Sequence, residues 1–158
     1  MIGWDGKRRV KGTKVHVLAT KEGIPLCLML SRGSLHDSKM FFDLVSSLKL
    51  KGARGRPRSR PDELAADKAY DSRKVREYLR SRGIRASIPR RRVRRQGKRG
   101  RPYRFIKERY LKGRCGVDRF FGWLKSFRRL ALRYERLVDT FMGFVLFASF
   151  LIAWRFLQ

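Results

Sequence analysis

Alternating apolar and polar residues near the start of the chain predict a β-hairpin. In "TKVHVLAT", residues 13–20, apolar side chains such as Val15 and Val17 recur at every second position, as in a strand with one buried face. The stretch "LCLMLSR", residues 26–32, is more uniformly apolar and predicts a second, more fully buried strand. Because only a short turn containing Gly23 separates them, the two strands are expected to pair as a hairpin.

Helical periodicity alternates with short apolar runs in the middle of the chain. A first helix is expected to begin near Ser34 or Asp37, either of which can cap it. A second helix is expected over residues 71–83, closed by a glycine. Short strands are predicted before and after this second helix, at residues 64–66 and 84–89.

Two further helices are predicted in the last part of the chain. The first spans roughly residues 105–137, with Gly113 as a candidate interruption, and the second spans residues 139–156. The second contains the apolar run "FMGFVLFASFLIAW", residues 141–154. A membrane-spanning helix needs about 20 apolar residues, so this run is interpreted as a buried helix in preference to a membrane anchor.

The order of these elements predicts an α/β domain, with a mixed sheet and flanking helices. An antiparallel hairpin followed by two strand–helix crossovers is what remains of a ribonuclease-H-like fold when its first strand is missing, here followed by two C-terminal helices. The expected organisation is one domain over residues 1–158, with a basic N-terminal arm at 1–12 and a basic mobile loop at 89–104.

The charge of the chain points to a polyanionic partner. Its 158 residues include 41 Lys and Arg against 13 Asp and Glu, a formal net charge of +28. Such an excess repels itself unless a polyanion is near, so nucleic acid is the expected partner and an anionic membrane surface the weaker alternative. The tracts 54–60 and 90–104 contain no acidic residue, which favours binding to the phosphate backbone. The DNA-contacting residues expected in the second tract are Arg90, Arg91, Arg92, Arg94, Arg95, Lys98 and Arg99.

The cysteines and the N-terminal residues favour a cytoplasmic location. Cys27 and Cys115 show neither disulfide nor zinc-site spacing, which suits a reducing compartment. The first residues are polar and basic, without the apolar stretch of a signal peptide. No membrane partner is therefore expected.

Two carboxylates stand out in this basic chain. Asp67 follows the predicted strand 64–66, at the strand end where an open α/β sheet presents its ligands. Asp118 lies within a predicted helix, on one polar stripe with Arg114 and Lys125. If they converge in a cleft, the two acids could hold divalent metal ions while the neighbouring cations bind phosphates. The alternatives are a helical ion pair for Asp118 and a capping or turn acid for Asp67, and spacing alone leaves both interpretations open.

Several motifs, in order along the chain, resemble those of one enzyme family. The segment "ADKAYDS", residues 66–72, is similar to the second catalytic block of DDE insertion-sequence transposases. "GVDRFFGWLKSFRRLALRYERL", residues 116–137, is similar to their third block, and Arg114, Asp118 and Lys125 match the family's Arg-x3-Glu-x6-Lys signature. The segments "DGKRRVKGTKVHVL" and "SLHDS" also match, so the resemblance covers nearly the whole chain.

This resemblance implies metal-dependent DNA cleavage and strand transfer during transposition, in a prokaryotic cell. Asp67 and Asp118 would be catalytic residues and ligands of a two-metal site for Mg²⁺ or Mn²⁺. The phosphates of DNA are expected to be contacted by Arg114, Lys125, Arg128 and Arg129.

Two departures from the family pattern affect the expected activity. Asp118 stands where Glu is usual, and the aspartate that the family carries on its first strand does not occur here. We therefore expect an N-terminally truncated catalytic domain with an incomplete metal site, inactive alone. Its expected partners are transposon-end and target DNA, the product of an upstream or overlapping frame that supplies the missing strand, and a second copy in a homodimer. The alternative interpretation is a basic DNA-binding remnant without catalysis.

Overall fold

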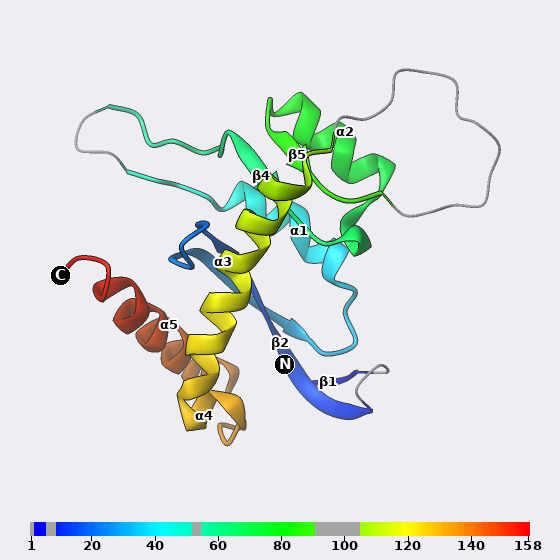
Figure 1. Ribbon diagram of the computed structural model, residues 1–158. Helices are drawn as coiled ribbons and strands as arrows, with labels where there is room; N and C mark the ends of the chain where they lie inside the picture. The colour runs from blue at the N-terminus through cyan, green and yellow to red at the C-terminus, as the bar shows by residue number, and fades with distance from the viewer. Residues whose placement is uncertain (1, 6–8, 52–54, 91–104) are drawn as a thin grey trace.

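A three-stranded antiparallel sheet forms one half of the structure (Figure 1). The computed structural model describes residues 2–5, 9–51, 55–90 and 105–158. The strands, which pair in sequence order, are β1 (Gly3–Asp5), β2 (Val10–Ala19) and β3 (Pro25–Arg32). Val15 lies opposite Leu30, and Val17 lies opposite Leu28. The predicted hairpin is therefore confirmed.

The N-terminal residues 1–12, expected to form a basic arm, include strand structure in their described part. β1 pairs with the first residues of β2, so that Gly3 lies opposite Gly12 and Asp5 lies opposite Val10. The sequence pattern did not indicate this pairing because an edge strand can carry polar and charged side chains. The first residues thus extend the sheet.

A parallel two-stranded sheet forms the other half. β4 (Glu63–Ala65) pairs with β5 (Arg85–Ser87). Between them run the short 3-10 helix η1 (Lys68–Tyr70) and α2 (Arg73–Ser81), which make the crossover that parallel strands require. This strand–helix–strand unit agrees with the sequence prediction.

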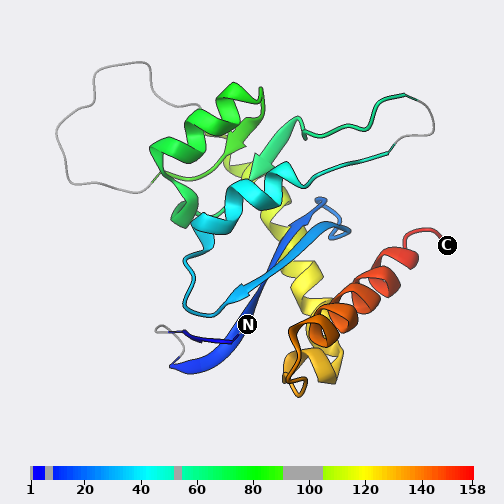
Figure 2. The same ribbon diagram turned by 180° about the vertical axis from the view of Figure 1, so that it is seen from behind.

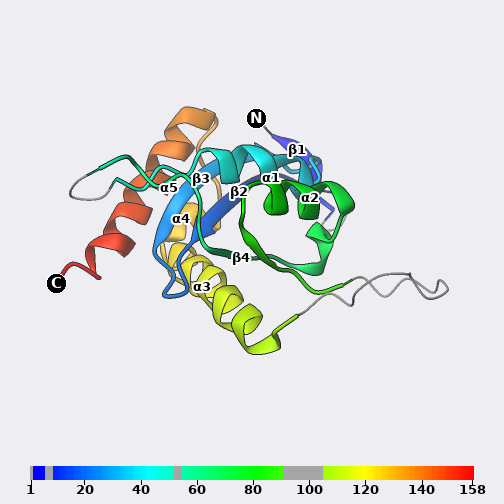
Figure 3. The same cartoon turned by 90° about the horizontal axis from the view of Figure 1, so that it is seen from above.

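Helices cover both faces of the antiparallel sheet. They are α1 (Asp37–Ser46), α3 (Lys107–Ser126), the short α4 (Arg128–Ala131) and α5 (Val138–Trp154). In Figure 1, α3 crosses in front of β2 while α5 lies beside the strands, and in Figure 2, seen from behind, α1 lies on the viewer's side. The view from above in Figure 3 separates the same layers.

Two hydrophobic cores fill these layers. The first joins α1, α2 and the parallel sheet, and its buried residues are Phe41, Val45, Leu64, Val75, Leu79, Ile84 and Ile88. The second joins α3 and α5, and its buried residues are Phe120, Leu124, Ala148 and Ile152. Leu18 packs against the first core, whereas Val15 and Val17 pack against the second. Because side chains alternate along a strand, β2 contributes to both cores.

The helix predicted over residues 105–137 is divided differently from the expectation. α3 continues through Gly113 without interruption, whereas residues 132–137 contain no helix. α3 ends instead before Phe127, whose extended backbone (φ −77°, ψ 100°) separates it from α4. The interruption expected at Gly113 was therefore wrong, and the glycine serves a packing role described below.

The C-terminal helix α5 is apolar around most of its circumference. Phe141, Val145 and Ile152 are buried, as predicted for this segment. Phe147 and Phe150, on its other side, are exposed to solvent. In the described part of the chain, no helix is both long and apolar enough to cross a membrane.

The expected single mixed sheet is present as two separate sheets. Within the described residues, no strand pairs with the second edge of β2 over residues 13–19, nor with the second edge of β4. A hollow of about 410 Å³ is lined by the ends of both strands and by α3. The fold is therefore mixed α/β, as predicted, but its sheet is in two parts that α3 connects.

Candidate active site

Asp67 lies at the carboxyl end of β4, where the parallel sheet meets its crossover. Its Oδ1 accepts a hydrogen bond of 2.7 Å from the backbone N–H of Lys68 and so caps η1. The side chain remains 54% exposed. The capping role considered from the sequence is thus present, and the carboxylate also has oxygen surface open to solvent.

Asp118 lies in the middle of α3, one turn after Arg114. Its Oδ2 is 3.6 Å from Nε of Arg114, in the helical i,i+4 arrangement considered from the sequence. The Asp118 side chain is 68% exposed. Such a pair alone is a common contact on helix surfaces. What distinguishes this site is that Arg114 also contacts Asp67, a residue of a different element.

Arg114 connects the two acids. Its Nη1 is 3.6 Å from Oδ1 of Asp67 and donates a hydrogen bond of 3.0 Å to the hydroxyl of Tyr110. The hydrogen bond to Tyr110 and the nearby negative charge, that of Asp67 more than that of Asp118, raise the pKa of Arg114 further above its already high value. Two carboxylates from separate elements therefore converge on one guanidinium.

Close packing of α3 against β4 explains how Arg114 reaches Asp67. Gly113 directly precedes Arg114, and Ala65 lies two residues before Asp67. A Cβ atom built at Gly113 would lie only 2.6 Å from Cβ of Ala65. Such an approach is too close for any residue with a side chain, so glycine brings this part of α3 onto β4.

A second glycine of α3 allows an equally close approach to the antiparallel sheet. A Cβ atom at Gly116 would lie 2.1 Å from the carbonyl oxygen of Thr20, in the turn between β2 and β3. α3 therefore contacts both sheets within a single turn of helix. This placement holds the helix that carries Asp118 at a fixed position relative to both.

The two acids fit a divalent cation as a partial set of ligands. Mg²⁺ prefers oxygen ligands and is commonly held by one or two carboxylates, with water and substrate phosphate completing its shell. Asp67 and Asp118 can supply such carboxylates, since both are exposed and face the same guanidinium. The residues that the structure describes contain no group of three or more His, Cys, Asp or Glu side chains that could hold a metal.

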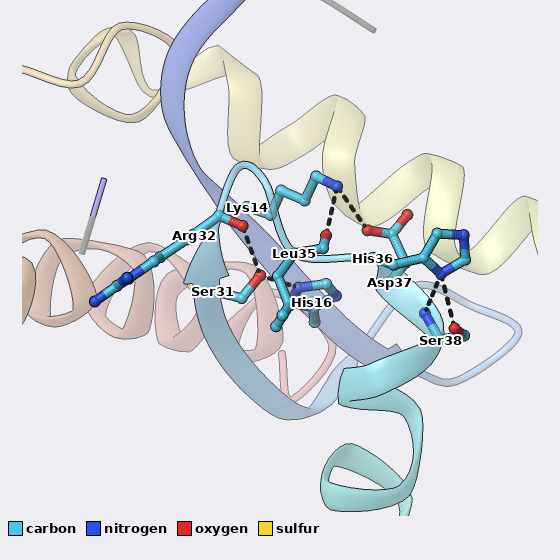
Figure 4. Close-up of polar contacts among 8 residues, drawn as sticks. All are labelled: Lys14, His16, Ser31, Arg32, Leu35, His36, Asp37 and Ser38. Atoms are coloured by element: carbon cyan, nitrogen blue, oxygen red, sulfur yellow. Dashed lines mark hydrogen bonds and ion pairs between the residues drawn. The ribbon is translucent and has the colours of Figure 1, made fainter. Parts of the chain in front are cut away.

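A polar cluster joins β2, β3 and the start of α1 (Figure 4). Nζ of Lys14 donates a hydrogen bond of 2.8 Å to the carbonyl of Leu35 and lies 3.1 Å from Oδ1 of Asp37. Burial raises the pKa of Tyr70 to about 12, and the charges of Asp37 and Asp67 act in the same direction. Asp37 and Asp67 thus act on one tyrosine. From the sequence, Asp37 was named as a candidate helix cap and as part of the "SLHDS" segment, whereas the cap of α1 in the structure is His36.

His16 is a buried member of the same cluster. One of its ring nitrogens, Nε2, is 2.7 Å from Oγ of Ser31 on the neighbouring strand. Burial lowers the pKa of His16, and this effect outweighs the opposing charge of Asp37. The contact joins two strands within the sheet, which gives His16 a structural role.

The other predicted DNA-contacting residues of this region lie toward the end of α3 and on α4. Lys125 is exposed in the last turn of α3, and Arg128 is exposed on α4. Nε of Arg129 lies 2.7 Å from Oε1 of Glu135, and its guanidinium lies 4.7 Å from the ring centre of Phe144. Arg129 therefore has protein partners in addition to its exposed surface.

The basic tract after β5 is described only at its beginning. Arg90 is exposed and lies outside any helix or strand. The predicted DNA-contacting residues that lie outside the described residues are Arg91, Arg92, Arg94, Arg95, Lys98 and Arg99.

Comparison with known proteins identifies the family of the chain. The family model described as "Transposase DDE domain" matches residues 2–151, which includes both acids and every described strand. The chain belongs to the DDE transposase family. The resemblance inferred from its motifs is thereby confirmed, and the family's ribonuclease-H-like fold agrees with the mixed α/β architecture.

Two relatives of this DDE transposase chain are insertion-sequence proteins. It is 33% identical over 148 residues to the putative transposase for insertion sequence element IS402 of Burkholderia cepacia, covering 93% of this chain but 65% of that protein. It is 30% identical over 150 residues to the putative transposase for insertion sequence element IS6501 of Brucella ovis, covering 89% of this chain and 96% of that protein. The chain thus spans less than two thirds of the first relative. No solved structure matches it significantly.

Proposed function

We propose that this chain forms the larger part of a catalytic centre that cleaves DNA at transposon ends and joins it to target DNA. The observation that carries the proposal is the convergence of Asp67 and Asp118 on Arg114. Membership of the DDE transposase family supports this chemistry, which uses acidic residues and divalent metal ions. The proposal places the protein on DNA, in the cytoplasm of a prokaryotic cell.

The proposed roles follow from the chemistry of each side chain. Asp67 and Asp118 would hold Mg²⁺ or Mn²⁺, which when bound would activate water and stabilise the leaving oxygen. Arg114 offsets the repulsion between the two acids and has donors suited to a phosphate group. Lys125 lies two helical turns beyond Asp118, where it can bind the DNA backbone as a point charge.

We further propose that the centre is completed by one additional strand between β2 and β4. Both strands have an unpaired edge in the described structure, and the hollow between them is lined largely by apolar surface from Val17, Ala19, Leu64 and Val117. A strand in this position would join the two sheets into one and would satisfy the backbone groups of both edges. An acid on that strand would provide the third carboxylate. The strand can come from a longer form of the chain or from the product of an upstream or overlapping frame.

A basic DNA-binding protein without catalysis is the second candidate. The net charge of +28 supports DNA binding whether or not the metal site is complete. The two candidates differ in what the acids do, because a protein that only binds DNA would gain affinity when a carboxylate near the phosphates is neutralised.

The experiment that separates them measures metal and DNA binding by acid-to-amide variants. We expect Mn²⁺ to raise the thermal unfolding midpoint of the wild-type chain, because a ligand that binds only the folded state stabilises it. Asp67→Asn and Asp118→Asn should each remove most of this shift while changing DNA affinity less than about threefold. Asp43→Asn, a change of an exposed acid on α1, is the matched control and should retain the full shift.

Strand transfer by the same variants is then measured in the completed assembly, with the missing strand supplied. Loss of strand transfer in Asp67→Asn and Asp118→Asn, with DNA binding retained, supports the catalytic proposal. Two results would instead support a DNA-binding protein without catalysis. One is that Mn²⁺ does not raise the thermal unfolding midpoint of the wild-type chain, and the other is that both variants bind DNA more tightly and transfer strands normally.

A further inference from the structure

A second hollow lies on a different flank of α3 from the one that carries Arg114. Its volume is about 310 Å³, and it lies between α3 and the turn that joins β2 to β3. In Figures 1 and 3, this turn lies beside α3. We call it the α3 flank hollow, and it is lined by Lys21, Glu22, Leu111, Lys112, Cys115 and Arg119.

The turn is held against α3 by close contacts. A Cβ atom at Gly23 would lie 2.8 Å from the ring of Trp123 and 3.2 Å from Cβ of Arg119. Nη1 of Arg119 also donates a long hydrogen bond of 3.5 Å to the carbonyl oxygen of Lys21. Lys21 is thereby held beside Lys112 and Arg119, although it lies far from both in the sequence.

The lining of the α3 flank hollow is predominantly cationic. Lys21, Lys112 and Arg119 are exposed, and Glu22 is the one acid among the described residues that line it. The carboxylate of Glu22 lies 3.6 Å from Nζ of Lys21, and a hydrogen bond from the Thr20 side chain lowers its pKa. Three cations against one acid leave the lining positive, and Lys and Arg are the usual donors to a phosphate group.

The cations of α3 form two rows on the exposed part of the helix. At about 100° per residue, Arg114 and Lys125 lie within about 20° of each other, and so do Lys112 and Arg119. The two rows are about 140° apart around the helix axis. The exposed residues between the rows are Glu108, Leu111, Cys115, Asp118, Gly122 and Ser126.

The separation of the two rows suits double-stranded DNA. A helix with its side chains is about 10–12 Å across, and the grooves of B-DNA are about 6 Å and 12 Å wide. Each groove is bordered by the phosphates of both strands. When the backbone of one strand lies on the row of Arg114 and Lys125, the backbone of the other strand is within reach of Lys112 and Arg119.

We propose that the α3 flank hollow binds a backbone phosphate of the uncleaved strand of duplex DNA, while the cleaved strand lies at Asp67 and Asp118. Lys21, Lys112 and Arg119 donate to the phosphate oxygens. The inference rests on the proposed function for the position of the cleaved strand. The phosphate contact itself needs no metal ion, so it can be tested separately from catalysis.

The first test measures the affinity of the full chain for a short DNA duplex, in the presence of EDTA and over a range of salt concentrations. Lys112→Gln/Arg119→Gln should weaken binding about tenfold and should reduce the salt dependence by about two phosphate contacts. Glu22→Gln should act in the opposite direction and strengthen binding about twofold, because it removes a negative charge beside the phosphate.

Lys74→Gln/Arg80→Gln is the matched control. It removes the same charge from exposed positions on α2, which does not line the hollow. Its effect on the duplex should be less than about threefold. A single strand of the same sequence should distinguish the two hollow cations only weakly, since it has no second backbone to occupy them.

The second test uses Cys115, which is exposed in the lining, as a reporter of occupancy. Duplex DNA should slow the labelling of its thiol by a maleimide in proportion to the fraction of chain bound. Cys115→Ser measures the background from the partly buried Cys27. Inorganic phosphate at the same phosphate concentration should give little protection, because a free ion has no second contact with the chain.

Several results would overturn the proposal. They are a loss of duplex affinity in Lys112→Gln/Arg119→Gln no larger than in the α2 control, an equal loss for duplex and single strand, and protection of Cys115 by inorganic phosphate alone. Unchanged thermal unfolding midpoints exclude misfolding as the cause of a loss. Failure of the catalytic proposal would appear separately, as a wild-type chain that Mn²⁺ does not stabilise.

Discussion

At the scale of single residues, Arg114 has the most informative environment. It contacts Asp67 and Asp118 at 3.6 Å each, and all three side chains are about half exposed or more. Exposed ion pairs of this kind contribute about 0–1 kcal/mol each, so they do not explain the fold. Their value is electrostatic: a cation between two acids offsets the repulsion between them and so holds the two carboxylates close together.

His16 gives a residue-scale prediction about pH. Its pKa is lowered in the folded protein, so the unfolded chain binds the proton more readily. The contribution of His16 to the free energy of unfolding should therefore be complete above its pKa in the unfolded chain, about 6.5. It should be lost as the pH falls through and below that value. Replacing His16 with Gln should remove this contribution.

The measurement is urea unfolding of both proteins between pH 5 and pH 8. The difference between the wild type and His16→Gln isolates the histidine, since all other groups are common to both. The wild type should lose its advantage as the pH is lowered. A difference that is constant across this range would show that His16 titrates alike in both states.

At the scale of elements, α3 is the part of the fold that positions the site, and its glycines can be tested. An alanine in place of a mid-helix glycine normally stabilises a helix by about 0.5–1 kcal/mol. At Gly116 the new Cβ would lie 2.1 Å from the carbonyl of Thr20, a backbone atom that cannot rotate away. The steric cost of such overpacking, about 1–3 kcal/mol, outweighs the gain.

Gly116→Ala should therefore lower the free energy of unfolding by about 1–2 kcal/mol, measured by urea denaturation. Gly122→Ala is the matched control on the same helix, because a Cβ atom there meets nothing within 4 Å. This second variant should be as stable as the wild type or slightly more stable. Equal stabilisation by both changes would show that α3 does not approach the β2–β3 turn this closely.

The same helix shows how far the sequence could predict the structure. The hairpin, the crossover unit and the i,i+4 relation of Arg114 to Asp118 follow from local spacing, and the structure has all of them. The meeting of Arg114 with Asp67 does not follow from spacing, because it depends on α3 packing against β4. From the sequence, Gly113 was interpreted as a break in a helix. Glycine is typical both of helix ends and of positions where a helix packs closely against another element, and sequence alone does not distinguish the two.

At the scale of the whole molecule, the strand proposed above would lie between the two sheets that the structure describes. Adding a strand between β2 and β4 should form backbone hydrogen bonds along both edges. We expect amide hydrogen exchange to slow about tenfold or more at the amides of residues 13–19 that do not bond to β3, and at residues 63–65. The probe is the chain coexpressed with the segment encoded directly upstream.

Amides of α5 serve as the internal control, because that helix lies away from the hollow. Their exchange should be unchanged. Protection spread evenly over the whole chain would indicate general stabilisation, and no protection at either edge would show that the strand binds elsewhere or not at all.

The contact between Gly113 and Ala65 also constrains how this family can diverge. The crossing of α3 over β4 has room for one methyl group, shared between two positions that lie far apart in the sequence. An alanine at position 113 would be tolerated where position 65 is glycine, so the two sites should exchange their small residues as a pair among homologues. Selection for the position of Arg114 beside Asp67 would thus leave its trace at residues 65 and 113, which carry no charge themselves.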